Sequence, residues 1–103
     1  MRPLIAIALL VVVTACSGGG TQPVAVDIAD FDFTPGQVEV PAGTTVTWTY
    51  GEGGSVHTVT FDDGDSGDLR AGDTYERTFD APGEHPYVCF YHPNMTGTVS
   101  VAG

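Results

Sequence analysis

The chain has 103 residues, which is enough for one domain. It carries 13 acidic residues against three arginines and no lysine, so its formal net charge is −10 at pH 7. This balance excludes a nucleic-acid-binding role, because the chain lacks the cations that neutralise phosphates. The negative charge is compatible with electrostatic attraction of a basic partner. It is also compatible with a role in keeping the protein soluble in a salty or acidic setting.

Residues 1–15 are predicted to be an export signal rather than part of the domain. Arg2 gives a positive start, and an unbroken apolar run extends from Leu4 to Val13. That run is too short to span a bilayer as a helix, which needs about 20 residues, and it is typical of a secretory signal. The run ends in Val13-Thr14-Ala15-Cys16, which resembles the lipobox of bacterial lipoproteins. The resemblance implies cleavage before Cys16 and attachment of lipid to that cysteine.

Residues 16–23 are predicted to form a flexible tether. Ser17 to Pro23 is rich in glycine and small polar residues, which have no capacity to pack. Two or more acyl chains anchor a protein stably, at roughly 0.8 kcal/mol per buried methylene. We therefore expect a lipid-anchored protein on the outer face of the cytoplasmic membrane, or in the periplasm or at the cell surface. The alternative is an ordinary secreted protein in which Cys16 lies near the cleavage site by chance.

Residues 24–103 are predicted to form one all-β domain. Short alternating stretches are separated by glycine, proline and aspartate, and no window has a helical period. Strands are expected at 24–28, 37–40, 44–50, 57–61, 74–80, 87–89 and 97–101. About seven to eight short strands predict a β-sandwich with Greek-key connections. Six aromatic residues are expected to supply much of its core: Phe31, Phe33, Trp48, Tyr75, Phe79 and Tyr87.

Cys89 is the only thiol left if Cys16 carries lipid, so it cannot form an intramolecular disulfide. A lone thiol is unusual in an exported protein because an oxidising compartment attacks it, and a bond to a metal would protect it. The segment Cys89-Phe90-Tyr91-His92-Pro93-Asn94-Met95 places a thiolate, an imidazole and a thioether at three-residue intervals between two strands. These soft ligands suit copper better than the cations that prefer oxygen.

His57 is the candidate for a second imidazole, because it begins a predicted strand and loops at one end of a sandwich lie close together. Two histidines, one cysteine and one distant methionine make the trigonal site with a weak axial ligand that is typical of electron-transfer copper. The sequence therefore predicts one type 1 copper ion held by four residues: His57, Cys89, His92 and Met95. The alternatives are an ordinary packing role for His57 and a gap-filling core role for Met95.

Two other groups of residues are predicted to have no metal. The segment from Asp62 to Gly72 carries four aspartates, but it lacks the spacing of a calcium loop with its closing glutamate. We expect it to be a solvated loop that faces a partner. The third histidine, His85, shares the strand parity of Cys89 but lies more than about a dozen ångströms from the site end, at about 3.3 Å per residue. It is predicted to pack in place of an aromatic residue.

Three stretches of the chain resemble the cupredoxin family, specifically its plastocyanin and amicyanin branch: Gly43–Trp48, Val56–Phe61 and Tyr87–Val99. The Cys-x-x-His-x-x-Met spacing is closer to that of amicyanin than to that of plastocyanin, whose loop is longer. The resemblance implies a Greek-key sandwich with one copper ion. It also implies that His57, Cys89 and His92 are strong ligands, that Met95 is the weak axial one, and that electrons pass through the exposed edge of His92.

Two positions depart from the family pattern. Tyr50 stands where relatives often have asparagine after the tryptophan strand, and Thr58 follows the first ligand where amicyanin has asparagine. Thr58 is nevertheless expected to hydrogen-bond across to the ligand loop.

The predicted function is a monomeric electron shuttle that touches the membrane only through its lipid. Its partners would be extracytoplasmic redox proteins, such as a cytochrome or a copper or quinone oxidoreductase, which dock through a basic surface. A copper oxidase or nitrite reductase needs a second copper site built from extra histidines, and this chain has three histidines in all. A storage or scavenging protein favours methionine-rich open sites, and only Met1 and Met95 are present. An adhesion module without metal would leave Cys89 unexplained.

Overall fold

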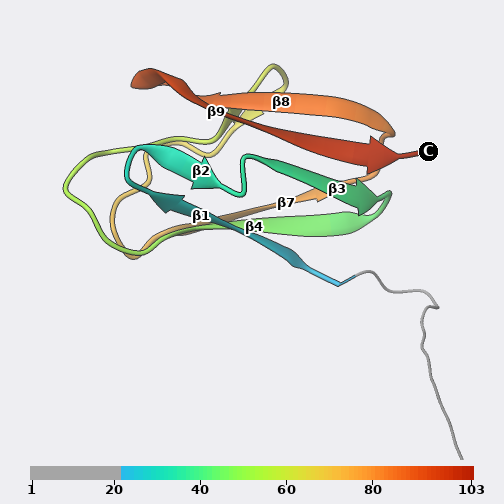
Figure 1. Ribbon diagram of the computed structural model, residues 1–103, viewed down its shortest axis with the longest axis horizontal. Coiled ribbons are helices and arrows are strands. Elements are labelled where there is room, and N and C mark those ends of the chain that lie inside the picture. Colours follow the sequence, from blue (N-terminus) through green and yellow to red (C-terminus); the bar gives the residue numbers. More distant parts are fainter. Residues whose placement is uncertain (1–21) are drawn as a thin grey trace, which may run out of the picture.

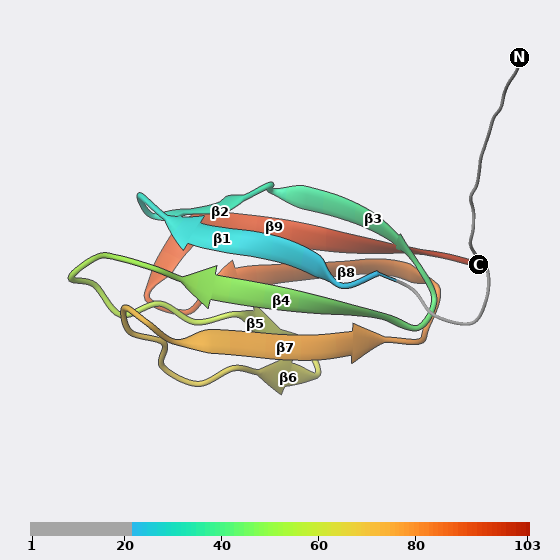
Figure 2. The ribbon, with the colours of Figure 1, turned by 90° about the horizontal axis from the view of Figure 1, so that it is seen from below.

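A computed structural model describes residues 22–103 as two β-sheets packed face to face (Figures 1 and 2). The predicted signal, Cys16 and most of the tether lie outside the described residues. Within residues 22–103 there is no helix, and so none that could cross a membrane. The strands are β1 (Val24–Ala29), β2 (Asp32–Thr34), β3 (Gln37–Pro41), β4 (Thr44–Tyr50), β5 (Thr60–Phe61), β6 (Gly64–Asp65), β7 (Thr74–Phe79), β8 (Gly83–Cys89) and β9 (His92–Ala102).

Both sheets are mixed, with the strand orders β2-β1-β4-β7 and β3-β9-β8-β5-β6. The parallel pairs are β1 with β4 and β3 with β9, and the longest antiparallel pair is the hairpin of β8 and β9. The prediction of an all-β sandwich is confirmed. Nine strands form instead of about seven to eight, because β2 and β6 are short pieces with no periodic signal of their own.

The strand boundaries differ from the predicted ones where pairing overrides local pattern. The predicted strand at 57–61 shrinks to β5, because His57 instead makes an isolated bridge to Leu69. The predicted strands at 87–89 and 97–101 are longer in the structure, because β8 and β9 pair from Gly83 opposite Val101 to Cys89 opposite His92. The hydrogen-bond ladder therefore carries residues that have low strand propensity on their own.

Trp48 is the centre of an aromatic core between the sheets. Strand β4 alternates between buried and half-buried residues, so that Val46, Trp48 and Tyr50 all face inward. The indole of Trp48 packs against four aromatic rings: Phe61, Tyr75, Phe79 and Tyr87. Such edge-on and tilted pairs stabilise by about 0.5–1.5 kcal/mol each beyond the burial of their area.

The predicted core role of Phe31 is wrong. Phe31 is 56% exposed, whereas Phe33, two residues later, is buried and packs on Tyr87. The reason is the tight turn between β1 and β2, which consists of Asp30 and Phe31, so that Phe31 belongs to neither strand.

Three connections meet at one end of the sandwich, on the left in Figures 1 and 2. They are the β1–β2 turn, the segment between β4 and β5, and the turn between β8 and β9. The first described residues and the C-terminus lie at the opposite end (Figure 1). The residues predicted to bind a metal all lie at or beside these three connections.

Candidate metal centre

Two imidazoles and one thiol converge at this end of the molecule. The ligand atoms of His57, Cys89 and His92 all lie within 4.8 Å of one another. The Cys89 sulfur is 3.8 Å from Nδ1 of His57 and 3.4 Å from Nδ1 of His92. In the part of the chain that the structure describes, no other group of histidine, cysteine and acidic side chains has such spacing. The predicted convergence is confirmed.

Cys89 reaches the site because of its parity in β8. Residues two apart on a strand face the same side, so Tyr87 and Cys89 both point into the sandwich. The thiol is completely buried and is not part of a disulfide. A buried, unpaired thiol beside two imidazoles is a ready soft ligand.

His57 is held from two sides. Its backbone exchanges two hydrogen bonds with that of Leu69, at 3.1 Å and 2.7 Å, although neither residue belongs to a named strand. Its ring packs at 4.9 Å on the ring of Tyr50, whose hydroxyl donates to the Ser55 carbonyl at 2.8 Å. A side chain at Gly53 would collide with the same phenol, so the loop can close over Tyr50 only because residue 53 is glycine.

Burial lowers the pKa of His57, and the neighbouring His92 lowers it further by charge repulsion. The His57 imidazole is therefore favoured in its neutral form, in which a ring nitrogen keeps a lone pair for a metal.

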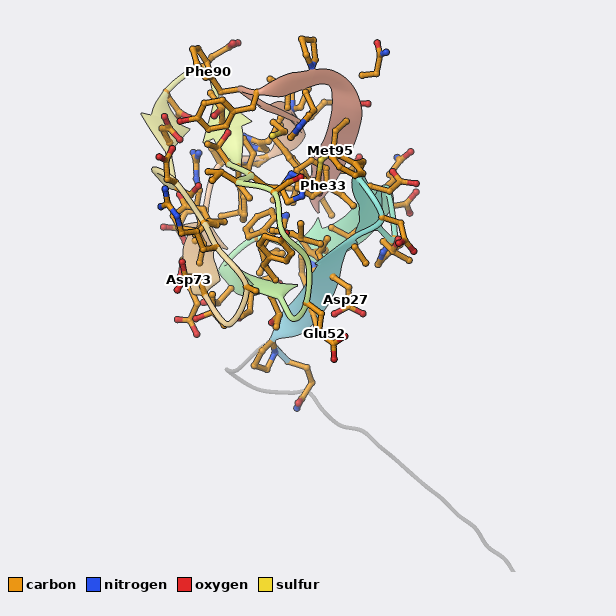
Figure 3. The ribbon with its side chains drawn as sticks, turned by 90° about the vertical axis from the view of Figure 1, so that its left-hand side faces the viewer. Asp27, Phe33, Glu52, Asp73, Phe90 and Met95 are labelled. Carbon is orange, nitrogen blue, oxygen red and sulfur yellow. The ribbon has the colours of Figure 1, made fainter. Side chains whose placement is uncertain are left out.

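A bulge in the β8–β9 hairpin separates His92 from Met95. Cys89 pairs with His92, but Val88 pairs with Thr96, so the residues between have no partners in β8. Pro93 has no N–H to donate to the ladder, which favours a break at this point. Within this unpaired stretch Met95 is buried, 2% exposed, and joins the hydrophobic core, while His92 stays half-buried. Figure 3 faces this end and shows Phe90 at the upper edge of the view and Met95 closer to its middle.

Thr58 ties the two ligand-bearing segments together. Its buried hydroxyl accepts a hydrogen bond from the Phe90 N–H at 2.8 Å and shares another with the Thr60 hydroxyl, also at 2.8 Å. Thr58 directly follows one candidate ligand, and Phe90 directly follows another. The predicted hydrogen bond to the ligand loop is confirmed.

His85 stays out of the cluster, as the sequence predicts. Its ring packs edge-on against Phe79 at 5.3 Å, and Nε2 donates to the Ala81 carbonyl at 2.8 Å.

The aspartate loop holds no candidate metal group and is anchored by its own side chains. Asp63 forms a two-pronged ion pair with Arg77, at 2.9 Å for each contact, and this pairing lowers the pKa of Asp63. Asp68 accepts a hydrogen bond from the Tyr91 hydroxyl at 2.7 Å, which links this loop to the ligand loop.

Sequence reasoning missed the supporting role of two aromatic residues. The inward parity of Tyr50 in β4 is visible in the sequence, but its contact with His57 is not. Phe31 packs against both imidazoles, and no sequence signal distinguishes it from a core residue.

Comparison with known proteins agrees with this geometry. Residues 3–101 match the family described as the cupredoxin-like domain. The chain belongs to this family. Over 83 residues this cupredoxin is 39% identical to amicyanin-alpha of Methylorubrum extorquens, an alignment that covers 74% of this chain and 69% of that protein.

Two solved structures have a similar fold. An oxidised amicyanin variant matches with a TM-score of 0.71 and 30% identity, over 76% of this cupredoxin and 80% of that chain. A copper-containing nitrite reductase from Thermus scotoductus matches with a TM-score of 0.74 and 27% identity, over 89% of this cupredoxin but 25% of that chain.

The donor set of this cupredoxin fits a soft metal ion. Two imidazoles, a thiol and a buried thioether are the groups that copper prefers, and the described site contains no carboxylate within the cluster. His57, Cys89, His92 and Met95 are thus positioned to bind a metal.

Replacing Thr58 by valine should loosen the site without removing a ligand. The change keeps the side-chain shape but removes the acceptor of the part-buried Phe90 N–H bond, which costs about 1 kcal/mol. We expect the metal-free protein to unfold at lower denaturant concentration, and the Phe90 amide to exchange with solvent faster. Thr58→Ser keeps the hydroxyl and should preserve slow exchange at Phe90. Equal Phe90 exchange in the valine and serine variants would contradict this role of Thr58.

Proposed function

We propose that this cupredoxin binds one type 1 copper ion and passes single electrons between extracytoplasmic redox partners. The convergence of His57, Cys89 and His92 within 4.8 Å is the observation that carries the proposal. These three residues would be the strong ligands, and Met95 would be the weak axial one. Bound copper would supply the one-electron chemistry, while the protein sets the geometry and the surroundings of the ligands.

The restraints on the site favour electron transfer over catalysis. Backbone hydrogen bonds to Leu69 fix His57, and the hydrogen bond from the Phe90 N–H to the Thr58 hydroxyl fixes the ligand loop. The sandwich buries Cys89 completely. Ligands that move little suit a site that must serve two oxidation states. An enzyme with a second copper site would need another histidine cluster, and residues 22–103 contain none.

The exposed end of the molecule offers an aromatic contact surface for a partner. The large apolar side chains that the described structure exposes all come from this end: Phe31, Phe90 and Tyr91, at 56%, 70% and 47%. We call them the aromatic rim. Phe31 packs edge-on against the half-buried His92, and Phe90 and Tyr91 directly precede it in the chain. The ring edge of His92 would then carry electrons between the site and the surface. A partner that covers this rim would bring its own redox centre close to the ligands.

Charge points to a basic partner. The chain carries a net charge of −10, and Asp68 lies directly beside the rim through its bond to Tyr91. Because the neutral phenol donates that bond, the carboxylate of Asp68 raises the pKa of Tyr91. A positively charged surface would be attracted from a distance and would then meet the aromatic rim.

The copper-loaded domain, made from residue 22 onward, should show an intense red absorption band from charge transfer between thiolate and copper. Cys89→Ser should abolish the band because it removes the sulfur ligand, while the β-sandwich signal in circular dichroism stays. His85→Ala is the matched control, because His85 lies outside the cluster and the band should remain. A colourless wild-type protein that takes zinc as readily as copper would refute the electron-transfer role.

Asp68→Asn should slow electron transfer to a basic c-type cytochrome at low salt by about twofold. That factor corresponds to the loss of one charge pair about 10 Å apart in water. Asp80→Asn is the matched control, because it changes the net charge equally but follows β7 at the opposite end (Figure 2). The rates of the wild type and of Asp68→Asn should converge in high salt. Equal effects of the two substitutions at low salt would show that only net charge matters.

We further propose that Cys16 carries a lipid that holds the protein at the outer face of the cytoplasmic membrane, or in the periplasm or at the cell surface. The first described residues lie at the end opposite the site, so a tether there would leave the aromatic rim facing away from the lipid (Figure 1).

In bacteria that make the full chain, Cys16→Ser should prevent incorporation of labelled fatty acid and release the protein from the membrane fraction. Cys89→Ser should leave both unchanged, because the buried thiol is not the lipidated one. Membrane retention of the Cys16→Ser protein, without label, would exclude the lipid anchor.

A further inference from the structure

The turn between β1 and β2 has an unusual backbone. Asp30 and Phe31 are its two central residues, with φ angles of 54° and 60°, and Ala29 pairs with Asp32 on either side. Two-residue hairpin turns of this left-handed kind favour Asn, Asp or Gly. Asp30 suits its position, but a bulky residue with positive φ is a genuine outlier. Phe31 is therefore held in a conformation that glycine would adopt with less strain.

Burial in the core does not explain this strain. The Phe31 side chain is 56% exposed, so it gains little from the hydrophobic effect. Strained residues persist where surrounding structure over-determines them, and they cluster at functional sites.

The contacts of the Phe31 ring do explain its position. Its centroid lies 5.5 Å from the His57 ring and 5.0 Å from the His92 ring, and it meets both rings edge-on at 84°. The two imidazoles are 5.0 Å apart and come from different connections. Phe31 thus bridges two candidate ligands from a third connection that supplies no ligand itself.

Phe31 also covers the site. It lines a hollow of about 110 Å³ beside His57, together with Tyr50 and the loop that follows β4. Removing the ring would enlarge this hollow toward both imidazoles. His92 is the most exposed of the candidate ligands, so it has the most to lose from that change.

We propose that Phe31 is a positioning residue for the metal centre, which fixes the orientation of both imidazoles and restricts access of solvent to them. The strained turn is retained because it presents the ring at this place. The inference rests on the proposed function in one respect, namely that His57 and His92 are metal ligands. The ring contact itself involves only protein side chains and can be tested on the metal-free protein.

The test compares two substitutions in the same turn. Phe31→Gly and Asp30→Gly each place glycine where φ is positive, but only the first removes the ring. Phe31→Gly should leave the denaturant midpoint of the metal-free protein close to that of the wild type, because relief of strain offsets the loss of the ring contacts. Asp30→Gly should also change it little, because aspartate already suits its position. Only Phe31→Gly should disturb the site. We expect it to speed the loss of bound copper to a chelator by about tenfold, at the low end of the effect of outer-shell partners on metal sites.

Proton NMR of the metal-free protein gives the second measurement. The ring centroids of His57 and His92 lie 5.0 Å apart, so Overhauser contacts between their imidazole protons should weaken in Phe31→Gly and persist in Asp30→Gly. Phe31→Tyr keeps an aromatic ring and should keep both the Overhauser contacts and slow copper release.

Three outcomes would overturn the inference. They are unchanged Overhauser contacts between the two imidazoles in Phe31→Gly, unchanged copper release in that variant, or a drop in its denaturant midpoint as large as that of Phe33→Ala. The last would make Phe31 an ordinary packing residue like the buried Phe33. If the wild type takes up no copper, the proposed function fails, and the NMR comparison still decides whether Phe31 orients the two rings.

Discussion

The site depends on the approach of the Cys89 sulfur to the His57 ring, at 3.8 Å, across 32 residues of sequence. Cys89 belongs to the β8–β9 hairpin, whereas His57 follows β4, a strand of the other sheet. The approach therefore exists only when the two sheets are packed correctly around Trp48. The Thr58–Phe90 hydrogen bond fixes the same pair of segments one residue further along each. These contacts are made by protein atoms alone, so the fold itself draws the two ligand-bearing segments together.

The sequence predicts the features that follow from the alternation of inward and outward residues along a strand and from the chemistry of the ligand side chains. The inward direction of Cys89 follows from its place two residues after Tyr87, and the soft donor set follows from residue types. Other features depend on tertiary pairing. His57 forms an isolated bridge to Leu69 rather than part of a strand. Met95 faces inward at a bulge that the local sequence pattern does not predict. Phe31 is misassigned to the core because its hydrophobicity is visible in the sequence but its turn geometry is not.

In the proposed docking with a redox partner, charge would act at long range and the aromatic rim at short range. One of the two arginines in residues 22–103, Arg77, is engaged with Asp63 and lies over the rings of Phe61 and Phe79, 4.4 Å and 4.9 Å from their centroids. Little positive charge is left to offset the acidic residues, so the long-range field is attractive to cations in general. Such a field fades over about 8 Å at physiological salt and does not choose an orientation well. The aromatic rim lies at one end of the described structure, and it would supply the orientation that charge lacks.

An electron-transfer ligand faces two opposed demands. In the proposed electron transfer, His92 would have to reach the surface so that a partner can approach it. Its ring would also have to stay in place, because ligand motion would slow the transfer. Burial holds the side chains of Cys89 and His57 in place, but His92 is half-buried and needs another restraint. A contact from outside the ligand loop can hold an exposed ring without covering its edge completely. The edge-on contact of Phe31 at 5.0 Å has this form, and it also adds an aromatic surface for the partner. The strain at residue 31 is thus the consequence of placing a rigid ring beside a ligand that has to stay accessible.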